Sequence, residues 1–208
     1  MAERRGFVRA GEEVRRRDLL AAALDVVSEA GPDRATVRGI AARAGVTPGL
    51  IRHYFGTKEA LLAEAWLSLM AGMADAGSDA LDGVTDPVAR LAGFIGASLR
   101  PPVVDGRAMA LWAGFLHRMR SDAVLTTAHE AGYLAYRDRL EGLIAACGVA
   151  HEREKAIAIN ALVDGLWLEA SALPSAFAAG EVERIGLAAA GAILRLDLER
   201  EATCAMQG

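Results

Sequence analysis

The chain has 208 residues, of which 53% are hydrophobic and 24% charged, and its formal net charge at pH 7 is −4. This composition supports a well-buried core and argues against intrinsic disorder. No apolar run reaches the roughly 18 to 20 residues of a membrane span, and the first residues lack the apolar stretch of a secretory signal, so we expect a cytoplasmic protein with no membrane contact.

Charge is divided unevenly along the chain. Residues 1–60 contain eleven Arg and Lys against eight Asp and Glu, a net charge of +3, whereas the remainder carries −7. A basic first part on an acidic body is typical of a DNA-binding domain joined to a domain with another role. Cys147 and Cys204 have no Cys or His at metal-ligand spacing, so we expect reduced thiols and no metal.

The first predicted helix begins near Arg15, after a polar segment. Residues 1–12 are polar and lack periodicity, so we expect them to form a mobile arm. From Arg15 onward apolar residues recur at helical spacing, until Gly31 and Pro32 stop the helix.

Two short helices joined by a tight turn are predicted next. Thr36 caps the first, and Gly45 follows it where the chain needs a left-handed residue. Thr47 caps the second, with Pro48 at the first helical position, where the missing N–H has no cost. Such a pair forms a helix-turn-helix, which places its second helix in the DNA major groove.

A fourth helix then leads away from this head. Gly56 ends the preceding helix, and Thr57 caps a helix that runs from Lys58 to about Ala76. The first three helices are expected to form a compact head. Its core is expected at Ile40, Ile51 and Phe55.

The rest of the chain predicts a helical bundle. Further helices are expected near 86–99, 105–120, 122–147, 151–173 and 180–199, which makes the fold all-α with about nine helices. Residues 156–173 and 182–198 are apolar nearly all round, and such helices must be buried on every side. In a domain this small, a second subunit most economically covers one side, so we expect a homodimer through the last two helices.

The helix-turn-helix residues carry a family resemblance. The string Ile40-Ala41-x-x-Ala44-Gly45-Val46-Thr47-x-Gly49-x-Ile51-x-His53-Tyr54-Phe55-x-x-Lys58-Glu59-x-Leu61 resembles the signature of the TetR-family transcriptional regulators. Segments 161–168 and 110–115 are similar to segments of its BetI-like branch. The resemblance implies a DNA-binding domain over residues 1–62 and a ligand-binding and dimerisation domain over residues 63–208. It also implies that the dimer binds a palindromic operator.

The DNA-binding residues are expected on the helix-turn-helix and just after it. They are Thr36, Arg38, Thr47, Pro48, Gly49, Arg52, His53, Tyr54 and Lys58. Arg52 is the expected base reader, since Arg commonly binds guanine through two hydrogen bonds. Gly49 lets the backbone approach base edges, and Tyr54 and Lys58 match the family's phosphate-binding positions. The alternatives are simple capping for Thr36 and Thr47 and ordinary surface charge for Arg38 and Arg52.

Two residues depart from the family pattern. Arg52 stands where many members carry Tyr, and Leu50 where a small Thr or Ala is common. The operator sequence is therefore not predictable from the family.

Aromatic residues of the bundle are candidates for an effector pocket, although residues of this kind at helical spacing are usually core. The candidates are Trp66, Phe94, Trp112, Phe115, Met119, Tyr133, Asp164 and Trp167. Asp164 is expected to be buried near Trp167, where a carboxylate and an indole could hold a cation. The BetI-like resemblance points to quaternary ammonium compounds such as choline. Pairing of Asp164 with an Arg or a hydroxyl is the alternative.

We therefore predict a DNA-binding regulator, a repressor that a small molecule releases. The alternatives are a dimeric ligand-binding module or a helical-bundle enzyme, neither acting through DNA. The best acids or bases of such an enzyme would be His117, His129 or Asp164. No Ser-His-Asp order or Gly-rich phosphate loop accompanies them, so we expect no catalytic residues and no cofactor.

Overall fold

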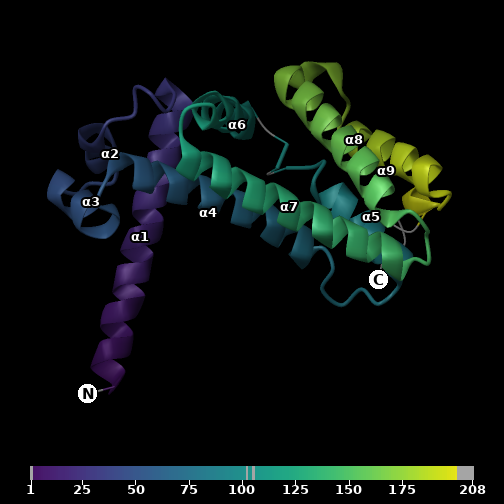
Figure 1. Cartoon of the computed structure of the whole chain (residues 1–208), viewed down its shortest axis with the longest axis horizontal. Coiled ribbons are helices and arrows are strands. Elements are labelled where there is room, and N and C mark those ends of the chain that lie inside the picture. The colour runs from purple at the N-terminus through teal and green to yellow at the C-terminus, as the bar shows by residue number, and fades with distance from the viewer. Residues whose placement is uncertain (1, 102, 105, 201–208) are drawn as a thin grey trace. The chain divides into compact units, whose positions relative to one another are not determined.

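The computed structural model describes residues 2–101, 103–104 and 106–200, without the side chains of residues 2–10, 73, 74, 76 and 106, and within these residues it contains helices and no strand. Figure 1 shows the elements in order. They are α1 (Ala2–Ala30), α2 (Val37–Arg43), α3 (Pro48–Phe55), α4 (Lys58–Asp79), α5 (Pro87–Ala97), α6 (Gly106–Met119), α7 (Ala123–Ala146), α8 (Glu152–Ala172), the 3-10 turn η1 (Pro174–Ala176) and α9 (Glu181–Leu194). The predicted all-α fold is confirmed.

The chain packs into two compact units. The first comprises Met1–Leu69 and Ala110–His129, and the second comprises Met70–Met109 and Glu130–Gly208. Helices α4, α6 and α7 each begin in one unit and end in the other. These units divide the chain by packing, whereas the predicted boundary after residue 62 divides it by function and stays a prediction.

Helix α1 ends as predicted but starts earlier. It stops at Ala30, and Gly31 follows in the left-handed region with φ of 80°. It begins at Ala2, so residues 2–12 of the expected mobile arm belong to this helix, and Met1 lies outside the described residues. Residues 2–30 contain no proline, and Glu12 and Glu13 stand four residues before Arg16 and Arg17, a spacing that stabilises a helix even where no face is buried.

The turn between α2 and α3 forms from local signals. The hydroxyl of Thr36 accepts a hydrogen bond from the N–H of Gly39 at 3.0 Å, which caps α2. Gly45 has φ of 66°, and the N–H of Val46 donates to the carbonyl of Ala41 at 2.9 Å. The expected core of the head is confirmed, because Ile40, Ile51 and Phe55 are all buried.

The second unit has its own apolar core, which α5, α8, α9 and the end of α7 share. Asp86 caps α5 by accepting a hydrogen bond from the N–H of Ala89 at 2.8 Å. Each of these four helices contributes buried residues to this core, among them Leu91, Ile95, Leu140, Ile144, Ile159, Val163, Leu187 and Leu194.

Helix α9 ends at Leu194 rather than near residue 199 as predicted. Arg195 is left-handed with φ of 60°, and the N–H of Leu196 donates back to the carbonyl of Gly191 at 3.0 Å. This fold-back is possible because Gly191 has no side chain: a Cβ there would lie only 2.6 Å from the carbonyl oxygen of Leu196. It returns Leu198 to the core.

Within the part of the chain that the structure describes, no helix is long and apolar enough to cross a membrane. Cys147 is a half-buried free thiol, and burial raises its pKa. Cys204, the second expected thiol, lies outside the described residues.

Candidate nucleic-acid interface and effector region

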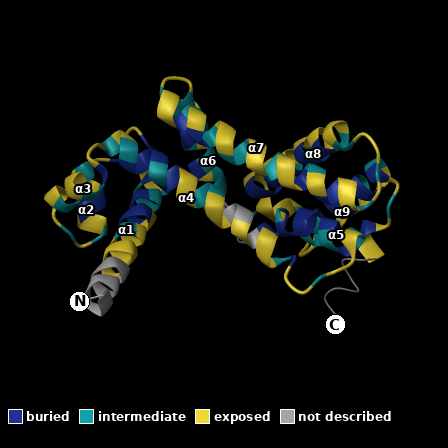
Figure 2. Ribbon diagram, turned by 60° about the horizontal axis from the view of Figure 1, so that its bottom comes forward, coloured by how far each residue is buried: buried dark blue, intermediate teal, exposed yellow. Residues whose placement is uncertain are grey.

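Helix α3 has an apolar inner face and a polar outer face. Ile51 and Phe55 are buried against the head. Four of the predicted DNA-contacting residues are exposed on the helix: Pro48, Gly49, Arg52 and His53. Figure 2 shows this exposed surface over α3. A short helix that presents such a face has the dimensions to enter a major groove about 12 Å wide.

The first turn of α3 leaves room for a close approach. Thr47 takes the N-cap position with an extended backbone, but its hydroxyl accepts no capping hydrogen bond. Its alternative interpretation, simple capping by the side chain, is therefore not what the structure has. The hydroxyl of Thr36, by contrast, is used in capping. A Cβ on Gly49 would meet only the hydroxyl of Thr47, at 3.9 Å, so the backbone here lies open to solvent.

The C-terminal end of α3 meets the start of α4 at the two predicted phosphate-binding residues. Tyr54 is half-buried, and Lys58 is the first residue of α4. Thr57 caps α4, since its hydroxyl accepts a hydrogen bond from the N–H of Ala60 at 3.1 Å. A cation at the start of a helix opposes the helix dipole, and an anion bound there would relieve that repulsion.

Arg16 of α1 holds this end of α3, and sequence reasoning missed it. Its guanidinium donates to the carbonyl of Tyr54 at 3.2 Å, pairs with Glu64, and lies 4.6 Å from the centre of the Phe55 ring. These partners are 38 and more residues away in sequence. No local pattern could have marked Arg16, because only the folded chain brings the partners together.

The two arginines of α2 have different surroundings. Arg38 is exposed, which leaves its predicted DNA contact open. Arg43 pairs with Glu29 at 2.5 Å and with Asp25 at 3.7 Å, and the hydrogen bond to Glu29 is the main cause that raises the pKa of Arg43. Arg43 thus ties α2 to α1.

The effector-pocket candidates are divided between the two units. Trp66, Trp112, Phe115 and Met119 belong to the first unit, and Phe94, Tyr133, Asp164 and Trp167 belong to the second. The sequence places these residues in apolar helices, but it does not indicate this division.

Trp66 and Phe115 are fully buried in the first unit. Their ring centres lie 4.9 Å apart, and the ring of His129 lies 5.7 Å from that of Trp66. The indole N–H of Trp66 is buried and has no hydrogen-bond partner among the described residues. A buried donor in that state is costly unless a further group accepts its hydrogen bond.

Asp164 is not buried, which corrects the expectation. Helix α8 packs on the core through Val163 and Trp167, and Asp164 lies on the adjacent face, which is exposed. Its carboxylate accepts hydrogen bonds from the hydroxyl of Tyr133 and, at 3.0 Å, from the side-chain amide of Asn160. Pairing with a hydroxyl, the alternative for Asp164, is the arrangement observed.

Tyr133 and Trp167 are held in place by these and other hydrogen bonds. Burial, and after it the hydrogen bond to Asp164, raises the pKa of Tyr133 to about 12, so its hydroxyl stays protonated near neutral pH. The indole N–H of Trp167 donates to the carbonyl of Val103 at 2.7 Å. The polar edge of Trp167 is therefore occupied by the backbone.

One exposed stripe of α8, here named the α8 face, is apolar. Ile157 is 39% exposed and Leu168 is 44% exposed, and Ala161 lies exposed between them. Asn160 and Ser171, which are polar, are buried instead. The helix therefore has apolar residues on an exposed stripe as well as in the core, and two polar residues on its buried side.

Comparison with known families matches both parts of the chain. Residues 19–65 match the model of bacterial regulatory proteins of the tetR family, and residues 87–195 match the model of the BetI-type transcriptional repressor C-terminal domain. The second match alone spans more than half of the chain.

Individual proteins agree with these matches. The HTH-type transcriptional regulator BetI of Klebsiella pneumoniae is 31% identical over 166 residues, which cover 77% of this chain and 84% of that protein. A solved transcriptional regulator from Pseudomonas aeruginosa PAO1 is 30% identical, with a TM-score of 0.79 and 94% of each chain covered. A Saccharomonospora viridis protein solved in complex with choline has the same fold at 18% identity, with a TM-score of 0.69 over 86% of this chain and 95% of that one.

Proposed function

The chain belongs to the TetR family of bacterial regulatory proteins and has a BetI-type C-terminal domain, and we propose that it is a repressor that binds a palindromic operator as a homodimer until a small molecule releases it. Like the other members of its family, it is a ligand-responsive DNA-binding regulator and not an enzyme. The observation that carries the proposal is the outer face of α3, where Arg52 and His53 are exposed beside the open backbone of Gly49.

The predicted DNA-binding residues make two kinds of contact, to bases and to phosphates. Arg52 and His53 bind base edges in the major groove, and Gly49 with Pro48 allows the first turn of α3 to come close to them. The remaining contacts are to phosphates and fix the position of the helix without reading sequence. They are made by Thr36, Arg38, Thr47, Tyr54 and Lys58.

Dimerisation follows from the apolar face of α8. A chain that exposes Ile157, Ala161 and Leu168 on one helix buries them by pairing with a second copy. Helix α9 adds the exposed small residues Ala188 and Ala192. The dimer holds two α3 helices at once, which suits two half-sites of a palindrome. Such a regulator works in the cytoplasm, where bacterial DNA is.

The effector that we propose is a small cation of the quaternary ammonium class. The carboxylate of Asp164 supplies the charge, and the aromatic rings near it on α7 and α8 supply cation–π attraction. The BetI-type match and the choline bound to a protein of the same fold support this class. The indole N–H of Trp66, for which the described residues offer no acceptor, is a second polar group available to an effector, in the first unit.

Binding to DNA upstream of the chain's own gene tests the proposal. We expect a shift of that DNA that weakens steeply with salt and is reversed by choline. The Arg52→Ala variant should lose about 1 to 3 kcal/mol of discrimination between operator and random DNA. Lys58→Ala should weaken binding to both DNAs alike. Salt-insensitive binding, or none, to all adjacent intergenic DNA would contradict the proposal.

A further inference from the structure

We propose that Arg16 of α1 is a positioning residue for base recognition: it fixes the C-terminal turn of α3, and with that turn the orientation of Arg52 and His53. The proposal rests on the proposed function, because it concerns how the same helix discriminates between DNA sequences. Arg16 acts through the helix that it holds and does not itself bind DNA.

The C-terminal end of α3 relies on groups outside the helix for its hydrogen bonds. The last four carbonyls of a helix have no partner within the helix itself. Gly56 and Thr57, which follow α3, donate their N–H groups to two of these carbonyls, at 2.9 and 2.8 Å. The carbonyl of Tyr54 accepts instead from the guanidinium of Arg16, at 3.2 Å. A side chain of α1 therefore completes the end of α3.

The guanidinium of Arg16 is held by three contacts. One terminal nitrogen donates to the carbonyl of Tyr54, and the other pairs with the carboxylate of Glu64 on α4. The guanidinium carbon also lies 4.6 Å from the centre of the Phe55 ring. The planar guanidinium presents its donors in a rigid fork, so these partners fix its place in a way that a flexible ammonium group would not. Arg16 therefore ties α3 to both α1 and α4.

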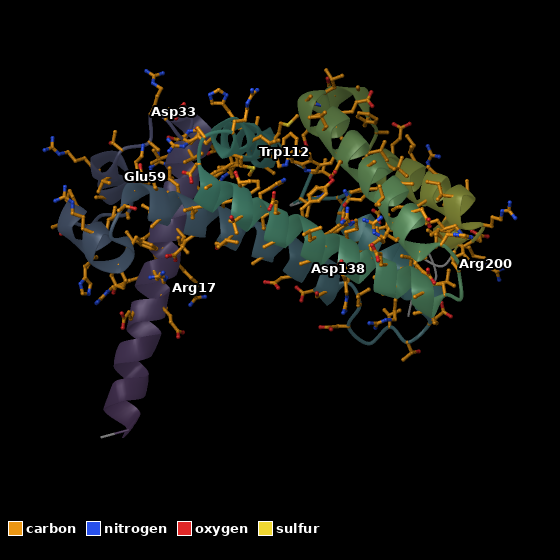
Figure 3. All side chains as sticks on the ribbon, in the orientation of Figure 1. Arg17, Asp33, Glu59, Trp112, Asp138 and Arg200 are labelled. Atoms are coloured by element: carbon orange, nitrogen blue, oxygen red, sulfur yellow. The ribbon has the colours of Figure 1, made fainter. Side chains whose placement is uncertain are left out.

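The neighbouring arginine on α1 has different surroundings. Arg17 is exposed and projects from the helix into solvent (Figure 3). Arg16 is half-buried and uses both of its terminal nitrogens within the head. Two consecutive arginines of equal charge thus differ in what they touch, and only Arg16 contacts the recognition helix.

The turn that Arg16 holds carries the proposed base readers. Arg52 and His53 immediately precede Tyr54, and the ring of His53 lies 5.4 Å from that of Tyr54. An arginine binds guanine through two hydrogen bonds only when both its position and its angle are correct. Because α3 has eight residues, a change of tilt at one end moves its whole outer face. Loss of the Arg16 contacts should therefore reduce discrimination between sequences more than it reduces attraction to DNA.

Titration of R16M and E64Q with two duplexes tests the proposal. One duplex is an operator that the wild type selects from a random library, and the other is a random sequence of the same length. R16M keeps an apolar side chain beside Phe55 but has no donor and no charge, whereas E64Q keeps Arg16 and removes the charge of its partner. We expect the ratio of operator affinity to random-DNA affinity to fall about tenfold in R16M, which is the lower part of what one bidentate arginine contact supplies, and by less in E64Q.

The two variants separate positioning from charge. If Arg16 and Glu64 acted only as charges, R16M would weaken and E64Q would strengthen binding to both duplexes, and the ratio would not change. Positioning predicts a lower ratio in both variants. R16M/E64Q should lower the ratio no further than R16M, because both changes remove one interaction.

The salt dependence of binding shows whether Arg16 touches DNA. The slope of log K against log salt should be the same in R16M as in the wild type. A slope that is shallower by about 0.9 in R16M would show that Arg16 neutralises a phosphate, and it would overturn the proposal.

Two matched controls remove the same charges from exposed neighbours. R17M acts on the next arginine of α1 and E59Q on a carboxylate of α4, and both should keep the wild-type ratio. Thermal unfolding checks that each variant is folded, and we expect melting temperatures within about 2 to 4 °C of the wild type, as for the loss of a half-exposed ion pair. All titrations are made well below the melting temperature, so a loss of stability alone would not change the ratio.

The outcomes distinguish this inference from the proposed function. A wild type that discriminates, with an unchanged ratio in R16M and E64Q, would overturn the role of Arg16 and leave the proposed function standing. An equal fall of the ratio in R17M and E59Q would also overturn it. If the wild type selected no duplex from the library, both would fail.

Discussion

Helices α3 and α8 expose residues of opposite chemical character. In α3 the buried residues are apolar and the outward ones include Arg52 and His53. In α8 the outward residues include Ile157 and Leu168, while Asn160 is buried. A polar outward face retains its water until a charged, hydrated partner replaces it, whereas an apolar outward face is costly in water until another apolar surface covers it.

The comparison shows that exposure alone does not identify a partner, but the chemistry of the exposed residues does. The outer face of α3 suits a nucleic acid, and that of α8 suits a second copy of the chain. If this is correct, changes to the outer face of α3 should alter only DNA binding. Changes to the α8 face should alter dimerisation, and DNA binding should weaken only because the dimer is lost.

The largest effect is expected from charging the α8 face. I157E/L168E would place two carboxylates where an apolar partner surface must bind, so the dimer should dissociate. Operator affinity should then fall about a thousandfold, because one head binds without the second. Sedimentation velocity and DNA titration measure the two effects. A145E, exposed on α7, is the control, and a dimer that persists in I157E/L168E would refute the role of this face.

Gly49→Val should produce the next largest effect, and only on DNA binding. A side chain here meets open space within the protein, so the melting temperature should stay near that of the wild type. On DNA the added side chain would separate α3 from the base edges and reduce operator affinity about tenfold to a hundredfold. Gly72→Val, at an equally open position of α4, is the control. Unchanged operator affinity in Gly49→Val would show that α3 does not approach DNA through its first turn.

Asp164→Asn tests whether the edge of the α8 face also receives the effector. Removing the charge should raise the choline concentration needed to release DNA by about tenfold, since an exposed carboxylate is partly screened. Binding to DNA without choline should be unchanged. Glu169→Gln removes an exposed charge from the same helix and should have no effect. An equal response of both variants would argue against Asp164 as the cation-binding group.

The smallest expected effect is on how the free energy of unfolding depends on pH. The pKa of Tyr133 is raised to about 12 in the folded chain, from 10.0 unperturbed, because burial and Asp164 favour the neutral hydroxyl. The unfolded chain releases this proton first as pH rises, so the resulting stability is complete below about pH 10 and is lost between about pH 10 and 12. Tyr133→Phe should show a smaller fall of the unfolding free energy across that window. Denaturant titrations at several pH values measure the difference. Parallel curves would contradict it.

Most of the head could be predicted because its signals are local. Gly31, Thr36 and Gly45 each act within four residues of their position, through a left-handed turn or a cap. The same holds for Thr57 at the start of α4. The helix over residues 2–12 was missed for a local reason too, since this segment has no hydrophobic period and its helix needs no buried face.

The candidate site could be predicted only where its residues are consecutive. The outward residues of α3 follow from the helical period, once Ile51 and Phe55 are recognised as core. The contact of Arg16 with Tyr54 and the pairing of Tyr133 with Asp164 join residues of different helices. The burial of Asp164 was mispredicted for the same reason, because periodicity does not say which side of an apolar helix a neighbour covers.

The sequence by itself determined the all-α fold, the helix-turn-helix and the family, since helical periods, caps and the motif from Ile40 to Leu61 are properties of neighbouring residues. Only the tertiary structure decided that Arg16 holds α3, that the pocket candidates belong to two units, and that Asp164 stands at the edge of an exposed apolar face. These features depend on which helix faces pack together, and packing is decided by contacts between residues that are far apart in the chain.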